Sequence, residues 1–160
     1  ILLDQDSYRF NNALDYEYDV EQFLKEYAQA QQVKEPLQKL NHYREAIKLY
    51  KGAYLPEINE TWVDSPRHCL QQNYLAILIQ VAELYLGMAN YDLALEYCQR
   101  ALDEDNCLEA AYRLSFRIYS AMGNRAAVVR QYQRCVEVLH REINTEPSPQ
   151  TQTLYHDLLK

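Results

Sequence analysis

The chain has 160 residues, of which 48% are hydrophobic, 3 are glycine and 5 are proline, and its formal net charge is −7. This composition predicts one soluble, helical domain and argues against a membrane span, because no apolar run is long enough to cross a bilayer. The negative charge also argues against a domain that wraps a nucleic-acid backbone, since the phosphates would repel it.

Residues 1–14 alternate in the manner of two short strands, Ile1–Leu3 and Tyr8–Phe10, on either side of a polar turn. An isolated hairpin is barely stable in water, so we expect this one to pack on another part of the protein. Two interpretations stay open: a frayed chain end, or the last hairpin of a preceding domain. The first residue is not Met and no signal peptide follows, so we expect a piece of a longer protein.

Two helices are predicted next. Asp19 and Gln22 form a potential capping box, which would open a helix through about Val33. The second helix is expected to start at Pro36, because proline is tolerated in a first helical turn, and to end at Gly52.

Residues 54–67 are predicted to form an extended loop, inserted between helix pairs. The loop contains Trp62, and a large aromatic residue in a loop is usually buried by its own scaffold. Trp62 and Arg67 are therefore predicted to anchor the loop against the helices. Ser65–Pro66, as cap and first turn, would then open a long helix from about Arg67 to Leu86.

The stretch Leu78–Val136 repeats itself with a period of 34 residues. Tyr85 recurs as Tyr119 and Asn90 recurs as Asn124, with small or apolar residues at matching positions around them. A fixed period of this length indicates stacked helix pairs, each unable to bury its apolar face alone. The two tyrosines are therefore predicted to be structural anchors. The period and the order of residues resemble the tetratricopeptide repeat.

Capping residues predict where the remaining helices begin. The predicted helices are Tyr91–Leu102 capped by Asn90, Leu108–Met122 opened by an Asn106/Glu109 capping box, one from Asn124 to about Arg141, and a short last helix after Ser148–Pro149. The predicted fold class is thus all-α: a tetratricopeptide-like, right-handed array of antiparallel helix pairs, about seven helices in all, with a short N-terminal β-hairpin.

No group of residues in the sequence predicts catalysis, a cofactor or a metal ion. The histidines (His42, His68, His140 and His156) lie on separate predicted elements, and the cysteines (Cys69, Cys98, Cys107 and Cys135) fit neither a CxxC motif nor a zinc site. Free thiols are favoured over disulfides, which suits a cytoplasmic protein. We therefore expect a protein that is not an enzyme.

In tetratricopeptide arrays the first helix of each pair lines a concave groove. The matching positions here are Ala76, Ile79, Glu83, Leu86, Ala110, Arg113, Arg117 and Ser120. Arg113 and Arg117 are four residues apart, so both project from one side of one helix and suit an acidic peptide, a terminal carboxylate or a phosphate. Alternatively they pair with Glu83 and Glu109 and join one repeat to the next; on that interpretation, replacing both arginines with alanine disturbs stability more than partner binding.

Several short motifs together resemble the bacterial transcriptional activator domain of antibiotic-regulatory-protein-type regulators, over about Asp19–Leu159. These motifs are Leu55-Pro56, Trp62, Arg67 with Leu70 and Tyr74, Gly87 with Tyr91 and Ala94, Glu109 with Ala111, Arg113 and Leu114, Tyr119 with Gly123, Tyr132, Leu139, and the run Glu146–Thr151. Asn106 and Val128 depart from the pattern of that family, in which proline and alanine are more usual.

The resemblance implies that residues 1–14 contain the wing of a preceding winged-helix DNA-binding domain and that residues 15–160 form the helical domain. It implies a regulatory and interaction module that orients or dimerises the DNA-binding domain and contacts the transcription machinery or sensor domains, without touching nucleic acid or membrane itself. On this view Trp62 and Arg67 have a second potential role, facing the missing domain. Two alternatives stay open: a tetratricopeptide peptide-binding adaptor, and an accessory domain of a larger signalling enzyme.

Overall fold

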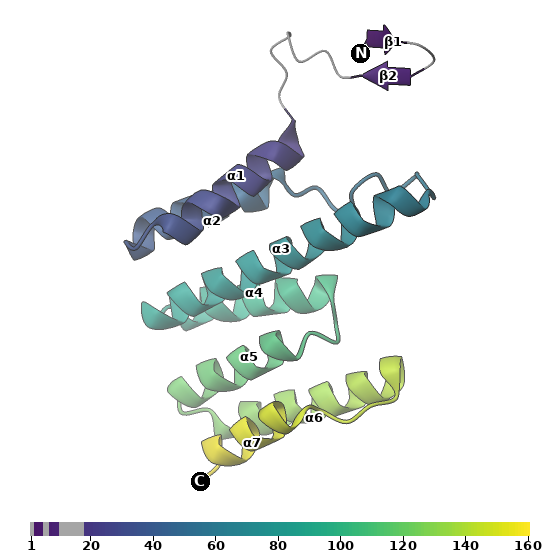
Figure 1. Ribbon diagram of the computed structural model, residues 1–160. Helices are drawn as coiled ribbons and strands as arrows, with labels where there is room; N and C mark the ends of the chain where they lie inside the picture. The colour runs from purple at the N-terminus through teal and green to yellow at the C-terminus, as the bar shows by residue number, and fades with distance from the viewer. Residues whose placement is uncertain (1, 5–6, 10–17) are drawn as a thin grey trace.

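The computed structural model describes residues 2–4, 7–9 and 18–160, and in this part of the chain seven helices follow two short strands. The elements are β1 (Leu2–Asp4), β2 (Ser7–Arg9), α1 (Asp19–Gln32), α2 (Pro36–Leu49), α3 (Thr61–Gly87), α4 (Tyr91–Glu104), α5 (Glu109–Ala121), α6 (Arg125–Ile143) and α7 (Pro149–Leu158). Helices α1 and α2, α3 and α4, and α5 and α6 pack as successive pairs, which are stacked in chain order (Figure 1). The all-α, tetratricopeptide-like prediction is therefore confirmed.

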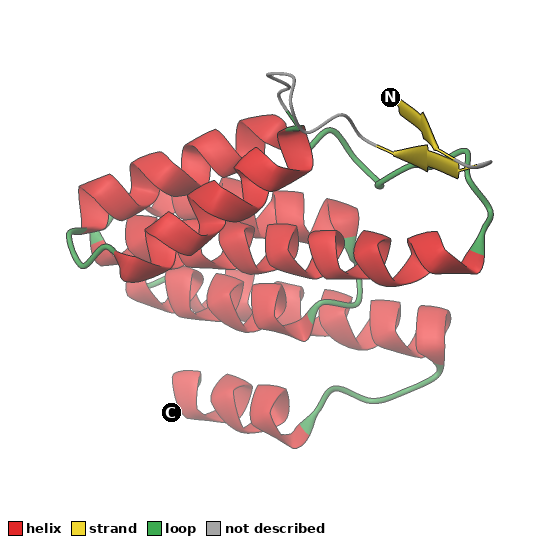
Figure 2. Ribbon diagram, turned by 45° about the horizontal axis from the view of Figure 1, so that its top comes forward, coloured by secondary structure: helices red, strands yellow, loops and turns green. Residues whose placement is uncertain are grey.

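The two strands pair antiparallel, with Leu3 opposite Tyr8. Figure 2 draws both strands in yellow, and they lie outside the layers of helices. Ile1 and Phe10, which were predicted as strand ends, and the predicted domain boundary at residues 14 and 15 lie outside the described residues.

Small side chains are among the most deeply buried residues of the helices. Six alanines have no exposed surface: Ala30, Ala46, Ala82, Ala94, Ala101 and Ala111. Between them large rings such as Tyr43, Tyr112 and Phe116, each at most 1% exposed, fill the core. A continuous core of this kind is what lets helix pairs that are unstable alone support one another.

The 34-residue repeat is visible at the level of single hydrogen bonds. Asn90 N–H donates to the Tyr85 carbonyl at 2.9 Å, and Asn124 N–H donates to the Tyr119 carbonyl at 2.8 Å. Each asparagine side chain then accepts from the backbone of the next helix, at Leu93 N (3.4 Å) and Ala127 N (3.0 Å). The same turn thus connects α3 to α4 and α5 to α6. Both predicted asparagine caps are confirmed.

The residue before each of these asparagines has a left-handed backbone, with φ of 56° at Ala89 and 70° at Gly123. An alanine costs about 1–2 kcal/mol in this conformation, whereas glycine adopts it freely. We therefore expect Ala89→Gly to raise the free energy of unfolding by about 0.5–1 kcal/mol, after part of the gain is offset by the greater freedom of glycine in the unfolded chain. Urea unfolding measures this change. The reverse substitution, Gly123→Ala, should destabilise the domain, and equal stability of all three proteins would contradict the prediction.

Helix α3 begins earlier than the sequence predicts. It starts at Thr61, not near Arg67, and Pro66 lies inside it rather than in its first turn. Val63 is fully buried and its N–H donates to the Glu60 carbonyl at 3.0 Å, so core packing orders the first turn ahead of the proline. The predicted loop is correspondingly shorter, from Tyr50 to Glu60.

Two predicted capping boxes are wrong. Tyr18, not Asp19, is the N-cap of α1, and the Asp19 carboxylate accepts from Val20 N–H at 2.9 Å. At α5 the N-cap is Leu108 rather than Asn106, since the carboxylate of Glu109 binds Ser148 instead. In the second case a contact far away in the sequence competes with the local one.

All four cysteines are free thiols. Cys98 and Cys135 are buried in the core. Burial raises the pKa of the Cys98 thiol to about 11 and that of Cys135 to about 12, so both stay protonated at neutral pH. They pack as small apolar side chains.

Candidate functional site

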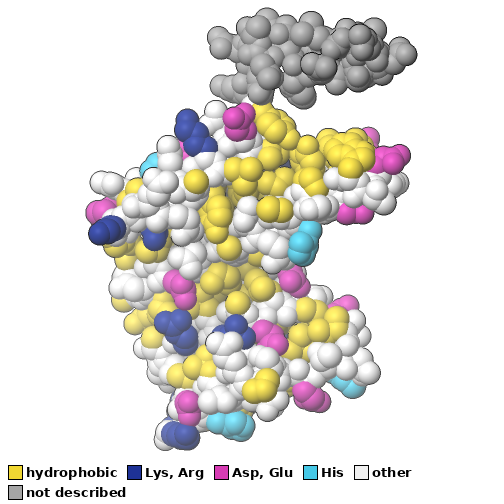
Figure 3. All heavy atoms as spheres, in the orientation of Figure 1, with side chains coloured by type: hydrophobic (Ala, Val, Ile, Leu, Met, Phe, Trp, Pro, Cys, Tyr) yellow, Lys and Arg dark blue, Asp and Glu magenta, His cyan; other side chains and the backbone are white. Residues whose placement is uncertain are grey.

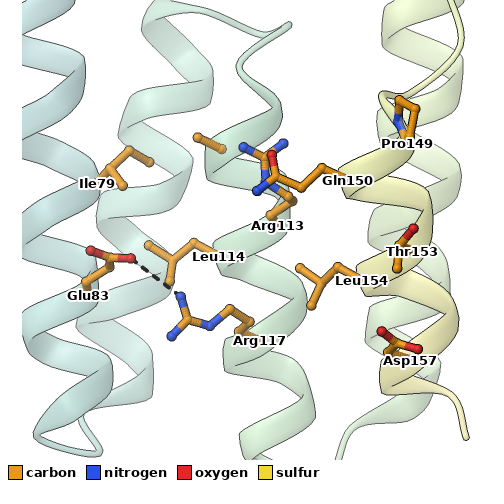
Figure 4. Close-up of a pocket in the computed structure, with 11 residues that line it drawn as sticks. Ile79, Glu83, Arg113, Leu114, Arg117, Pro149, Gln150, Thr153, Leu154 and Asp157 are labelled. Carbon is orange, nitrogen blue, oxygen red and sulfur yellow. Dashed lines mark hydrogen bonds and ion pairs between the residues drawn. The ribbon is translucent and has the colours of Figure 1, made fainter.

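A groove lies between α3, α5 and α7 and has a volume of about 640 Å³. Figure 4 shows its walls: Ile79 and Glu83 come from α3, Arg113, Leu114 and Arg117 from α5, and a third group from α7. The residues that α7 supplies are Pro149, Gln150, Thr153, Leu154 and Asp157. The structure thus brings Glu83, Arg113 and Arg117 together in one groove, where the tetratricopeptide pattern places them.

Arg117 and Glu83 form an ion pair across the groove, from α5 to α3. The Nη1 of Arg117 lies 3.4 Å from Oε1 of Glu83, and the two side chains are 50% and 43% exposed. Gln80 also donates to the Glu83 carboxylate, at 3.2 Å. An exposed pair of this kind contributes only about 0–1 kcal/mol, so little of the stability of the domain depends on it.

Arg113 has a different role, because its guanidinium is bound to α7. Its Nη1 donates to the Thr151 hydroxyl at 2.9 Å and lies 3.9 Å from the Glu109 carboxylate. Glu109 in turn accepts from Ser148, from the backbone N–H at 2.9 Å and from the hydroxyl at 2.7 Å. Arg113, Glu109, Ser148 and Thr151 form one network, here called the α7 clamp.

The clamp changes the acidity of its carboxylate. Burial raises the pKa of Glu109, but hydrogen bonds from Thr151 and Ser148 and the charge of Arg113 lower it by more, so that its pKa lies below the ordinary value. Glu109 is therefore ionised at neutral pH and holds the start of α7 as an acceptor. Of the two predicted arginines, Arg113 is bound in this network, whereas Arg117 contacts Glu83 across the groove.

The contribution of α7 to the groove was not foreseen from the sequence. The last helix packs on α6, where Tyr155 stacks on Tyr132 at 3.9 Å between ring centroids. Its other packing partner is α5, through the clamp. A signal for this was present: Ser148, Thr151 and Leu154 recur every three residues, which places two polar residues on the apolar face.

Trp62 and Arg67 lie in the first two turns of α3, far along that helix from Ile79 and Glu83. Arg67 donates to the carbonyl oxygens of Tyr54 (2.9 Å), Leu55 (2.7 Å) and Ile58 (3.1 Å) and so holds the Tyr50–Glu60 segment. Trp62, in contrast, is 60% exposed, so the expectation of a buried aromatic anchor is wrong. It fails because Trp62 sits on a helix, where Val63 takes the inward position instead.

Acidic and basic side chains alternate over the face that carries the groove, as Figure 3 shows. A single-sign surface that would attract nucleic acid is not seen on this face. Within the described part of the chain, no three His, Cys, Asp or Glu side chains are arranged to hold a metal ion. Nor does any helix described there combine the length and hydropathy needed to cross a lipid bilayer.

Comparisons with known proteins agree with this architecture. A solved structure from Plasmodium falciparum, the C-terminal TPR-containing domain of a protein described as an FK506-binding protein, is similar, with a TM-score of 0.61 and 11% sequence identity. The similarity covers 88% of this chain and 88% of that one, and at this identity it concerns the fold alone. No curated protein sequence matches significantly. Residues 18–159, which include the groove, the α7 clamp and the Tyr50–Glu60 segment, match the family described as the bacterial transcriptional activator domain. The chain therefore belongs to that family.

Proposed function

We propose that this domain is the regulatory and protein-interaction module of a bacterial transcriptional regulator, which positions or dimerises a DNA-binding domain ahead of it. In this role the groove between α3, α5 and α7 holds a segment of a partner protein. The observation that carries the proposal is the exposed Glu83–Arg117 pair inside a groove with apolar walls. Such a pair recognises an acidic side chain or a terminal carboxylate by exchange, while Ile79, Leu114 and Leu154 supply apolar contacts.

The partners follow from the same proposal. The antiparallel β1–β2 pair is assigned to the wing of the preceding DNA-binding domain, which reads DNA in place of the helical domain. The net charge of −7 supports this division of labour, because it disfavours direct contact with phosphates. The transcription machinery, a sensor domain or a second copy of the regulator would then occupy the groove.

A peptide-binding adaptor is the second candidate, and the fold similarity to a TPR-containing domain supports it. Both candidates use the groove, but only the first requires that groove variants change transcription. A role as accessory domain of a larger signalling enzyme is distinguished by a nucleotide-binding motif elsewhere in the full chain.

The test uses a full-length regulator carrying this domain. We expect Arg117→Glu to lower activated transcription about tenfold, because repulsion replaces an attraction worth about 1.4 kcal/mol. DNA affinity in a mobility-shift assay should stay within about twofold if another protein occupies the groove, and should fall if a second copy of the regulator does. The melting temperature should change little because the pair is exposed.

Arg130→Glu is the matched control, since Arg130 is an exposed arginine on α6 and is not among the groove residues. It makes the same change of charge and should leave transcription unaltered. Equal effects of the two substitutions, or unaltered transcription in Arg117→Glu, would speak against the groove as the partner site.

A further inference from the structure

A second cavity lies at the opposite end of α3, between α1, the start of α3 and the Tyr50–Glu60 segment. Its volume is about 630 Å³, within the range of about 300–1,000 Å³ that small-molecule sites occupy. Its lining residues are Tyr18, Asp19, Val20, Phe23, Leu49, Tyr50, Lys51, Gly52, Ala53, Tyr54, Leu55, Pro56, Trp62 and Leu70. Hydrophobic side chains gather over this end of the molecule in Figure 3.

Aromatic rings form much of the wall. Phe23 (2% exposed) and Leu70 (7%) are buried, whereas Trp62 (60%) is open to solvent. The Tyr50 ring packs between Phe23 and Tyr74, with centroid distances of 6.1 and 3.9 Å. The exposed indole of Trp62 offers a face on which a flat aromatic ligand can stack, and the buried rings form an apolar wall beside it.

The polar groups of the cavity favour an uncharged ligand. Tyr18 and Tyr54 share a hydrogen bond between their hydroxyls at 2.9 Å, and each hydroxyl can bond once more. Asp19 and Lys51, two exposed residues of opposite charge, give the lining no net charge. A neutral molecule can therefore use the hydroxyls without leaving an ion unpaired.

The wall is built before any ligand arrives. Arg67 fixes the segment through three backbone carbonyls, at Tyr54, Leu55 and Ile58. This segment is the insertion that interrupts the regular array of helix pairs. A wall already fixed by hydrogen bonds lowers the entropic cost of binding.

From these observations we infer that this cavity, here called the aromatic cavity, is a binding site for a small, uncharged molecule with two or three flat aromatic rings and one hydrogen-bonding group. A peptide or protein segment is the competing occupant. The concave aromatic wall and the neutral hydroxyl pair favour the small molecule, because they match a flat ring system and offer a peptide backbone few partners. The site is separate from the groove of the proposed function.

The test uses the 160-residue protein and N-phenyl-1-naphthylamine, a neutral aromatic probe that absorbs tryptophan emission. Trp62 is the only tryptophan of the chain, so energy transfer from it reports a bound probe, and the cavity-filling variants below locate that probe. We expect saturable one-to-one binding with a dissociation constant on the order of 100 μM, as the usual affinity per non-hydrogen atom gives for a molecule of this size.

Ala53→Phe, which fills the cavity, should weaken binding at least tenfold, and Ala126→Phe, at an exposed position of α6, should leave it unchanged. Val20→Phe serves as a second filling variant if Ala53→Phe does not fold, as judged by thermal melting. The anionic analogue 1-anilinonaphthalene-8-sulfonate should bind more weakly than the neutral probe. Binding that is not saturable, that survives both filling variants, or that occurs without energy transfer from Trp62 would overturn the inference, as would preferential binding of an aromatic peptide over the probe.

Discussion

Arg67→Met is expected to lower the free energy of unfolding by about 2–4 kcal/mol and to abolish probe binding in the aromatic cavity. Arg67 makes three charge-assisted hydrogen bonds to backbone carbonyls, and its side chain is only 26% exposed. Such bonds contribute about 1.5–3 kcal/mol each when they are lost singly, but water reaches part of this site and lowers the sum. Methionine keeps most of the apolar stem, so the change isolates the guanidinium.

Urea unfolding and the probe titration together measure this prediction. Arg67→Lys should give an intermediate loss, because one ammonium group does not reproduce the planar fork that contacts Tyr54, Leu55 and Ile58. Asp64→Asn is the control, because it removes the charged partner of Arg67, whose Oδ1 lies 3.4 Å from the Nη1 of Arg67. Asp64 is 71% exposed, so this substitution should change the free energy of unfolding by less than about 0.5 kcal/mol. Wild-type stability in Arg67→Met would show that the segment is held by its other contacts.

The features that the sequence predicts well depend on short-range interactions. The helix pairs follow from a period of 34 residues, and the turns at Asn90 and Asn124 follow from a residue that caps the helix directly after it. Each of these signals lies within a few residues of its effect. The helix pairs and asparagine caps of the folded structure therefore agree closely with the prediction.

The features that the sequence predicts poorly depend on partners distant along the chain. Glu109 has the right spacing for a capping box with Asn106, but Ser148, 39 residues away, binds the carboxylate instead. Trp62 is a large aromatic residue of the kind that is usually buried, but the early start of α3 places Val63 inward and leaves the indole exposed. Neither outcome is contained in the local pattern.

The groove contains one feature that the sequence predicts well and one that it predicts poorly. The repeat phase correctly places Ile79, Glu83, Arg113 and Arg117 together, because it fixes which face of α3 and α5 is concave. It does not distinguish the two arginines. Only the contact of Arg113 with Thr151 separates a clamp residue from a groove residue, and that contact depends on where α7 docks.

This difference between the arginines leads to an expectation for Glu109, the carboxylate of the α7 clamp. Glu109→Gln should lower the free energy of unfolding at pH 7 by about 2–3 kcal/mol, because an amide replaces a carboxylate that accepts two hydrogen bonds from Ser148 and lies 3.9 Å from Arg113. Hydrogen–deuterium exchange should become faster in α7 than in α3, since the clamp holds only the last helix.

The pH dependence distinguishes the clamp from a purely steric role. The pKa of Glu109 is lower in the folded protein than its ordinary value of 4.5, so the folded state binds the proton less readily than the unfolded state. The stabilisation is therefore fully present above about pH 5 and is lost as the pH falls through the folded pKa. The stability difference between wild type and Glu109→Gln, measured by urea unfolding, should accordingly shrink as the pH falls below about 5. Glu142→Gln, on the exposed end of α6, should show little difference at either pH, and a Glu109→Gln difference that stayed constant with pH would rule out an ionised clamp.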